Sequence, residues 1–391
     1  MPAHILVVDD EPDLELLVRQ KFRKHIRNEE FNFFFAHNGE EALDVLEQHK
    51  EIEILMTDIN MPKMDGLSLL SGIKERDVNP LLKSIIVSAY GDMANIRQAM
   101  NRGAFDFITK PIDFSDVEIT LQKTIGLLDT LKSAKRSEKE LTQLYQQLHA
   151  AKQIQQSILP QDFPPYPERK EFDVFAHMIA AKEVGGDFYD FFLIDENRFG
   201  FVIADVSDKG IPAAIFMAVS RTVLKGTATQ GISPSECLER VNTILNNESD
   251  SGMFLTAFYG ILDVKSGKID YANGGHNPPY LVRNGSGVIP VASNSDPLIG
   301  IIDNAKYEQF SLDLKEGDTL FLFTDGITEA LNKTEEMYSE DRLIETLRKQ
   351  TGSAPEVLIP SIISEIADFA QGAPQSDDIT CLAIRYNGAS T

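Results

Sequence analysis

Five polar residues in the first 110 positions stand where apolar runs of the sequence end. Asp9 and Asp10 follow HILVV, Asp58 follows EILMT, Ser88 follows KSIIV and Lys110 follows FDFIT. If these runs are parallel strands, their carboxyl ends share one sheet edge, where open α/β folds bind ligands. Crowded carboxylates there favour a divalent cation such as Mg²⁺. A carboxylate beside a cation and a lysine can accept a phosphoryl group, so the set predicts an aspartyl-phosphate site.

Four aspartates in the second half of the chain also stand at candidate strand ends. They are Asp187 in EVGGDFYD, Asp205 in ADVSDKG, Asp325 in TDGITEA and Asp377 in QSDDIT. If these carboxylates converge, their repulsion requires metal, and all-oxygen ligation suits Mg²⁺ or Mn²⁺. Two such ions roughly 3.5–4 Å apart can activate a water for attack on phosphorus. The alternative is four unrelated turn aspartates, since Asp-Gly at 325–326 is an ordinary turn signal.

The elements that must position the first set alternate over residues 1–125. Five apolar runs alternate with amphipathic segments that begin near Pro12, Gly39, Gly66 and Asp92. This alternation predicts a doubly wound α/β domain with a five-stranded parallel sheet covered on both faces.

Residues 3–125 resemble the CheY-like receiver domain of response regulators. The resemblance is carried by the runs VVDD, MTDINMPKMDG, SAYGD and FITKP. It implies that Asp58 accepts a phosphoryl group from a histidine kinase. Lys110 would then be the counter-charge, and Ser88 would bond to the phosphoryl oxygens. It also implies an Mg²⁺ ion held by Asp9, Asp10, Asp58 and the carbonyl of Asn60. Phe107 matches the switch aromatic, and the Lys110–Pro111 bond is expected to be cis.

Residues 126–160 are predicted to form a helical linker. The stretch 115–159 has no proline and one glycine, and Pro160 with FPPYP at 163–167 ends it. Heptad spacing puts one seam on Leu127, Thr130, Ala134, Ser137, Leu141, Leu144, Leu148, Ala151, Gln155 and Ile158. Seven of these ten residues are apolar, which favours a coiled-coil homodimer. The alternative is a surface helix packed on its own domain.

Residues 161–391 are predicted to form an α+β layered domain with a β-sandwich. Strand-like runs lie between 172 and 206, between 254 and 284, and at 318–326 and 378–386, with helices at 212–228, 234–247, 340–350 and 355–371. The runs before Asp205 and Asp325 have apolar residues at odd and even positions alike. An alternating pattern therefore does not indicate which face of the sheet these carboxylates point to.

The set GGDFYD, DVSDKG, NGGHNPP, TDG and DDIT resembles the metal-dependent protein phosphatases (PPM, PP2C-like) of the bacterial sigma-regulatory branch. The resemblance implies hydrolysis of phosphoserine or phosphothreonine on a protein by a metal-bound hydroxide. Asp205 would bridge two ions, Asp187 and the Val206 carbonyl would serve one ion, and Asp325 and Asp377 the other. Asp378 competes with Asp377 for its role.

The acid that protonates the leaving group has no assignment from the sequence. Eukaryotic members of the family carry a Gly-His pair after the bridging aspartate, where this chain has Val206-Ser207. His276 is a weak candidate for the acid, because Gly, Asn and Pro around it favour a structural turn histidine. Lys209 is a candidate for orienting the substrate phosphate, and the equal alternative is an exposed loop lysine without this role.

Composition excludes several classes of protein. The chain has 391 residues and a formal net charge of −23, which argues against nucleic-acid binding. It has no apolar run of the ~20 residues needed to cross a bilayer and no secretory signal, so we expect a cytoplasmic protein without membrane contact.

The motifs together predict a response regulator in which phosphorylation of Asp58 controls a protein phosphatase. By family resemblance the substrate would be a phosphorylated anti-sigma-factor antagonist. One alternative is a non-catalytic adaptor in a sigma-factor pathway. Another is a diguanylate cyclase, prompted by GGDF at 185–188, although Phe188 stands where the cyclase signature needs glutamate.

Overall fold

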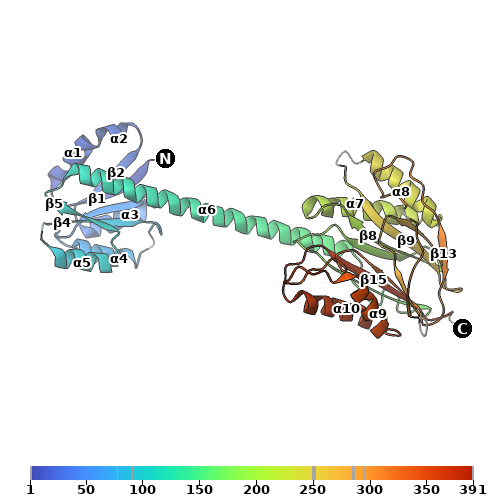
Figure 1. The fold of residues 1–391 in the computed structure, drawn as a ribbon. Coiled ribbons are helices and arrows are strands. Elements are labelled where there is room, and N and C mark those ends of the chain that lie inside the picture. Colours follow the sequence, from blue (N-terminus) through green and yellow to red (C-terminus); the bar gives the residue numbers. More distant parts are fainter. Residues whose placement is uncertain are drawn as a thin grey trace. The chain divides into compact units, whose positions relative to one another are not determined.

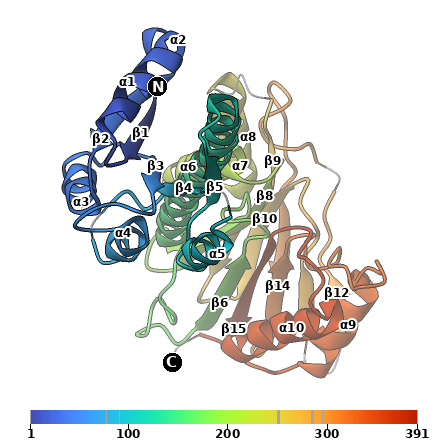
Figure 2. The ribbon, with the colours of Figure 1, turned by 90° about the vertical axis from the view of Figure 1, so that its left-hand side faces the viewer.

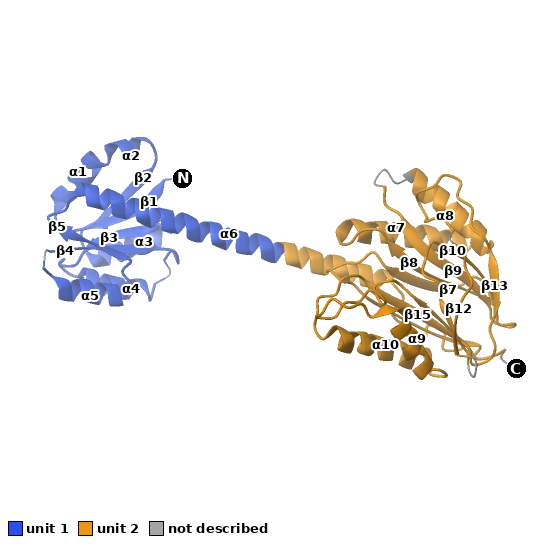
Figure 3. Cartoon of the chain, in the orientation of Figure 1, with its two compact units in different colours: residues 1–143 blue, residues 144–391 orange. Residues whose placement is uncertain are grey.

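The computed structural model describes residues 2–76, 78–89, 91–248, 252–283, 287–294 and 296–389. The chain divides into two compact units, residues 1–143 and residues 144–391 (Figure 3). Helix α6 (Phe114–Ile158) contributes its first part to one unit and its last part to the other.

Within its described residues, the first unit contains one five-stranded parallel sheet, as predicted (Figure 1). Its order is β2-β1-β3-β4-β5, so the connections reverse direction between β1 and β3. Ligands bind at such a switch point, outside the carboxyl ends of the strands. The strands are β1 (Ala3–Val8), β2 (Phe31–Ala36), β3 (Ile54–Asp58), β4 (Lys83–Ala89) and β5 (Asp106–Lys110).

Helices cover both faces of this sheet because successive strand residues point to opposite sides. Ile5 and Val7 pack in one cluster with residues of α1 and α6, whereas Leu6 and Val8 pack with residues of α3 and α4. The helices besides α6 are α1 (Pro12–Lys21), α2 (Arg23–Arg27), α3 (Gly39–Gln48), α4 (Gly66–Ile73) and α5 (Met93–Asn101). The short α2 was not predicted.

Helix α6 is buried near its two ends and exposed between them. Val117, Leu121 and Leu128 lie in the core of the first unit, and Gln155 is buried in the second. Every residue from 132 to 147 is exposed. The middle of the helix therefore packs on neither core, unlike the predicted alternative of a surface helix on its own domain.

The second unit has two five-stranded antiparallel sheets in its described part, ordered β13-β10-β9-β8-β7 and β12-β11-β14-β15-β6. The strands are β6 (Phe172–Ile179), β7 (Phe188–Leu193), β8 (Arg198–Val206), β9 (Leu255–Asp263), β10 (Lys268–Gly274), β11 (Tyr280–Arg283), β12 (Gly287–Pro290), β13 (Phe310–Asp313), β14 (Thr319–Phe323) and β15 (Ile379–Tyr386). The predicted sandwich is present, and β12 and β13 were not predicted.

Four layers result, because helices cover the outer face of each sheet. Helices α7 (Ile211–Ala228) and α8 (Pro234–Glu248) contact the first sheet, and α9 (Ser339–Lys349) and α10 (Pro355–Ala370) contact the second (Figure 2). Leu320 and Leu322 face the other sheet, while Phe321 and Phe323 pack against α9 and α10. Because β14 is buried on both sides, its residues are apolar at odd and even positions alike. No helix in the described part of the chain is long and apolar enough to cross a membrane.

Candidate functional site

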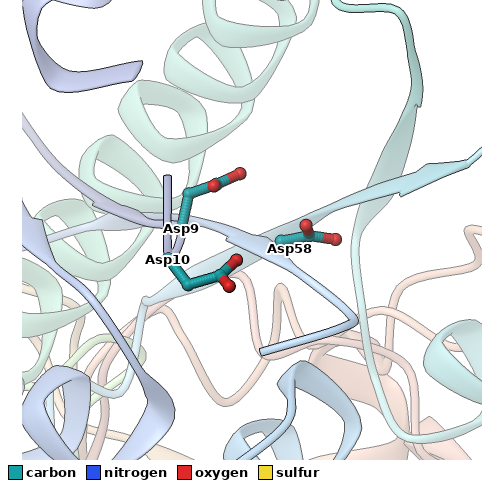
Figure 4. A group of neighbouring side chains, drawn as sticks. All are labelled: Asp9, Asp10 and Asp58. Atoms are coloured by element: carbon teal, nitrogen blue, oxygen red, sulfur yellow. The ribbon is translucent and has the colours of Figure 1, made fainter. Parts of the chain in front are cut away.

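Three carboxylates meet at the carboxyl edge of the parallel sheet (Figure 4). Asp9 and Asp10 directly follow β1, and Asp58 is the last residue of β3. One oxygen from each lies within 4.8 Å of the other two. Asp9 and Asp58 are buried and Asp10 is exposed. Three hard oxygen donors with one side open to solvent suit Mg²⁺, which keeps several waters when bound.

Lys110, the last residue of β5, reaches the same edge. Its Nζ donates to Asp58 Oδ2 at 2.6 Å and to Asp9 Oδ2 at 3.1 Å. Burial lowers the pKa of Lys110, but its bonds to Asp58 and Asp9 outweigh this and raise the pKa above its ordinary value. The ammonium therefore stays charged beside Asp58, where a transferred phosphoryl group would place its negative charge.

The remaining predicted residues of this edge surround Asp58. The backbone N–H of Asn60 donates to Asp58 Oδ1 at 3.3 Å, which holds the Asn60 backbone beside the trio. The Ser88 hydroxyl is buried and has no hydrogen-bond partner among the described residues. The side chain of Phe107 is 39% exposed, and the Lys110–Pro111 bond is cis. Tyr90, within the motif SAYGD, lies outside the described residues.

In the second unit, strand pairing brings the predicted aspartates together in two pairs. Phe188 of β7 pairs with Ala204 of β8, so Asp187 lies beside Asp205 in the first sheet. In the second sheet β14 pairs with β15, and the backbone N–H of Thr324 donates to Thr380 O at 3.0 Å. This pairing puts Asp325, just after β14, next to the segment that carries Asp377, just before β15.

One hydrogen bond joins the two pairs across the sheets, and one glycine beside each pair allows the backbones within that pair to pack closely. Thr324 Oγ1 donates to Asp187 Oδ2 at 2.7 Å. A Cβ atom on Gly186 would lie 2.9 Å from the Val206 carbonyl oxygen, and one on Gly326 would lie 2.0 Å from the carbonyl oxygen of Asp378. A side chain at either glycine would force these backbones apart, so GGD and TDG are needed for close packing at the site.

Burial and neighbouring carboxylates raise the pKa values of three of these aspartates. Burial, then repulsion from Asp205 and Asp378, raises the pKa of Asp187 well above its usual range. The pKa of Asp205 rises to about 7 because of burial, despite a hydrogen bond with Asp187, with repulsion from Asp325, Asp377 and Asp378 adding to the rise. Burial and Asp377 also raise the pKa of Asp325. Carboxylates that repel one another in this way are suited to binding hard cations, which prefer oxygen ligands.

Asp377 and Asp378 have different surroundings. Asp378 is buried, and its carboxylate accepts from the backbone N–H groups of Ala181 at 2.8 Å, Gly186 at 2.7 Å and Asp187 at 3.4 Å. Asp377 is partly exposed, and its Oδ2 pairs with Lys209 Nζ at 2.8 Å. Asp378 thus fixes the backbone that carries Asp187, while Asp377 holds the Lys209 ammonium at the site.

Comparison with known proteins supplies the family of each unit. Residues 5–122 match the response regulator receiver domain family, and residues 195–387 match the stage II sporulation protein E (SpoIIE) family. The first part is 31% identical over 127 residues to sporulation initiation phosphotransferase F of Bacillus subtilis, covering 97% of that protein and 32% of this chain. This chain joins a response regulator receiver domain to a SpoIIE-type domain.

Relatives of the SpoIIE-type domain support the assignment. The chain is 30% identical to protein IcfG of Synechocystis over 268 residues, which are 62% of the chain and 42% of IcfG. It is 28% identical to phosphoserine phosphatase RsbU of B. subtilis over 240 residues, 61% of the chain and 70% of RsbU. The chain thus spans less than half of IcfG. The SiaA-PP2C domain of Pseudomonas aeruginosa has the same fold, with a TM-score of 0.57 and 20% identity over 63% of this chain and 98% of that one.

Two residues of the SpoIIE-type domain remain to be placed. His276 is buried; its Nε2 lies 3.1 Å from Phe323 O and its Nδ1 2.7 Å from Thr256 Oγ1. Both ring nitrogens are occupied, so His276 has no free proton for a leaving group. Lys209, besides its pair with Asp377, donates to Ser376 O at 2.7 Å. The GGDF run at 185–188 leads into β7 of a PP2C-like fold. It therefore gives no support to the diguanylate cyclase alternative.

Sequence reasoning missed Gln155 and Thr324 and gave Asp378 only a competing role. Gln155 is buried in the last turn of α6 and bonds to the backbone of Gly185 in the Gly-Gly-Asp segment. Its signal in the sequence is a polar residue on the heptad seam. Thr324 directly precedes Asp325 in TDG, but nothing in that motif indicates a bond to Asp187.

Proposed function

We propose that this chain is a response regulator whose SpoIIE-type domain hydrolyses phosphoserine or phosphothreonine on a protein, under the control of Asp58 phosphorylation. The observation that carries the proposal is the meeting of the two sheets at Asp187, which accepts a hydrogen bond from Thr324 Oγ1 at 2.7 Å, with burial and neighbouring carboxylates raising the pKa values of Asp187, Asp205 and Asp325. Structural aspartates at unrelated turns would not interact in this way.

The phosphatase site would hold two Mn²⁺ or Mg²⁺ ions. Bound there, the ions would supply a hydroxide at neutral pH and neutralise the charge of the substrate phosphate. In this proposal Asp205 would bridge the ions, and Asp187 with the Val206 carbonyl would serve one of them. Asp325 and Asp377 would serve the other, and Lys209, which pairs with Asp377 at 2.8 Å, would help to orient the substrate phosphate.

The receiver site would accept a phosphoryl group from a histidine kinase onto Asp58. Mg²⁺ would be held by Asp9, Asp10, Asp58 and the Asn60 carbonyl. The unpartnered Ser88 hydroxyl would donate to a phosphoryl oxygen, and Lys110 would neutralise part of its charge. A buried hydroxyl without a partner costs free energy unless a ligand satisfies it, which supports this role for Ser88.

The linker would carry the signal as a homodimer. We divide the chain into a receiver at 1–125, a coiled-coil linker at 126–160 and a phosphatase domain at 161–391. The support is the exposed middle of α6, where Leu141 and Leu144 on the heptad seam are 53% and 50% exposed. Pairing with a second copy would bury them.

The substrate would be a phosphorylated anti-sigma-factor antagonist in the cytoplasm, with no nucleic acid or membrane involved. The phosphoserine phosphatases RsbU and RsbP of B. subtilis, 28% identical to this chain, support a phosphoserine protein as substrate. The net charge of −23 disfavours a nucleic acid.

The test is Mn²⁺-dependent phosphate release from a phosphorylated antagonist by the full chain. Asp205→Asn should abolish release, while the exposed Asp368→Asn on α10 should leave it unchanged. Beryllofluoride, which mimics the phosphoryl group, should alter turnover of the wild type and not of Asp58→Asn. Binding of the antagonist without any release would instead support the adaptor alternative, and full activity of Asp205→Asn would defeat the proposed chemistry.

A further inference from the structure

An apolar cavity of about 240 Å³ lies beside the segment that carries Asp377. The C-terminal half of α10 forms one wall, and the loop from Gly372 to Ser376 forms the rim. Ile179 at the end of β6 and Ile379 at the start of β15 also line it. None of the described residues that line the cavity is charged.

The rim of this cavity is fixed by hydrogen bonds. Gln375 Nε2 donates to Ile179 O at 2.9 Å and to Asp377 O at 2.6 Å. The Ser376 carbonyl accepts from Lys209 at 2.7 Å. The cavity is therefore already formed, and its rim is anchored to the residues that flank the proposed metal site.

The volume and position of the cavity limit what it can bind. Drug-sized ligands occupy pockets of roughly 300–1,000 Å³, so this cavity fits a side chain better than a cofactor. Its apolar walls would exclude a phosphate group. Ser376 lines the cavity and directly precedes Asp377, so the cavity lies next to the segment that carries a proposed metal ligand. An extended peptide advances about 3.3 Å per residue, which gives the three positions on either side of the phosphoresidue a reach of roughly 10 Å.

We propose that this cavity is a specificity pocket that takes an apolar side chain of the phosphoprotein substrate, within three residues of the phosphoserine. The proposal rests on the phosphatase activity proposed above and adds to it the sequence that the enzyme prefers. The metal site recognises only phosphate, so it does not distinguish one phosphoserine from another, whereas burial of a neighbouring leucine side chain does.

The test uses phosphoserine peptides of a Gly-Ser background in which a single leucine stands at each position from −3 to +3. With the full chain and Mn²⁺, one or two of these peptides should show a kcat/KM about tenfold above that of the leucine-free peptide. Ala367→Leu and Ala370→Leu add bulk to the cavity wall without disfavouring the helix, and they should remove this preference. Asp368→Leu places a leucine on the exposed face of α10 outside the cavity and should keep this preference.

Hydrolysis of p-nitrophenyl phosphate separates this inference from the activity itself. Its rate should be the same in the wild type and in all three variants, because this substrate reaches the metal site alone. Failure of the wild type to hydrolyse it would overturn the proposed activity. Equal rates on all peptides, or a leucine preference that survives Ala367→Leu and Ala370→Leu, would overturn the pocket while the activity stands. If light scattering shows that Ala367→Leu and Ala370→Leu are monomers while the wild type is a dimer, and the peptide preference is unchanged, the cavity binds a second copy of the chain. That result would also overturn the proposal.

Discussion

The side chain of Gln155 binds the backbone of Gly185 at two points. Its Nε2 donates to Gly185 O at 2.6 Å, and its Oε1 accepts from Gly185 N at 3.1 Å. Gln155 belongs to the last turn of α6, and Gly185 is two residues before Asp187. A shift or rotation of the end of the linker helix would therefore move the segment that carries a proposed metal ligand.

We expect Gln155→Leu to weaken metal binding in the phosphatase domain. The substitution keeps helix propensity and bulk but leaves the N–H and C=O of Gly185 without partners, at a cost of about 2 kcal/mol. The Mn²⁺ concentration for half-maximal turnover of p-nitrophenyl phosphate should rise about tenfold. Gln156→Leu, an exposed neighbour, is the matched control. An unchanged Mn²⁺ requirement in Gln155→Leu would show that the contact does not position Asp187.

The two adjacent aspartates before β15 should behave differently when each is changed to asparagine. Asp378→Asn should lower the free energy of unfolding by about 2 kcal/mol, because an amide cannot accept all three backbone hydrogen bonds. Asp377→Asn should change stability little and lower the affinity for Mn²⁺ at least tenfold. Urea unfolding and calorimetric Mn²⁺ titration check both variants. The ligand assignment is reversed if Asp378→Asn loses Mn²⁺ affinity at unchanged stability.

The sequence predicts the fold well where apolar runs are long and buried on both faces. The strands of the receiver and the run before Asp205 are of this kind. The short strands β12 (Gly287–Pro290) and β13 (Phe310–Asp313) are edge strands of their sheets with few apolar residues, and they escaped prediction. The five-residue α2 has no buried residue and hence no periodic signal.

The contacts within the site depend on pairings that no local pattern encodes. Gln155 contacts a residue 30 positions away, and Asp378 bonds to a backbone N–H 197 positions away. The direction of Asp325 was left open because TLFLFT is apolar at both parities. It follows from the second sheet being covered on both faces, which is a property of the assembled domain.

The seam of α6 should govern the oligomeric state. Leu144→Lys would put a charge into the buried interface of the proposed coiled coil, so we expect it to convert a dimer into a monomer. Gln143→Lys, exposed and off the seam, is the control and should remain dimeric. Sedimentation velocity of the full chain measures the outcome. A wild-type monomer at micromolar concentration would contradict the coiled-coil proposal.

His276 should make the phosphatase domain sensitive to acid. Burial lowers the pKa of His276 to about 4, although its bond to Phe323 O works in the opposite direction. The unfolded chain, with a histidine pKa of about 6.5, binds more protons between pH 6.5 and 4 than the folded chain does. The stability contributed by neutral His276 is therefore complete above pH 6.5 and is lost as the pH falls toward 4. At about 1.4 kcal/mol per pH unit the loss amounts to about 3 kcal/mol.

The pKa can be measured directly from the imidazole resonances of His276 in NMR spectra, with His276→Gln identifying the signal. Gln keeps a donor that can reach Phe323 O and cannot be protonated in this range. Its free energy of unfolding should therefore fall less steeply than that of the wild type between pH 6.5 and 4.5. Parallel slopes in urea titrations, or a resonance that titrates near pH 6.5, would show that the His276 ring is not held neutral between Thr256 and Phe323.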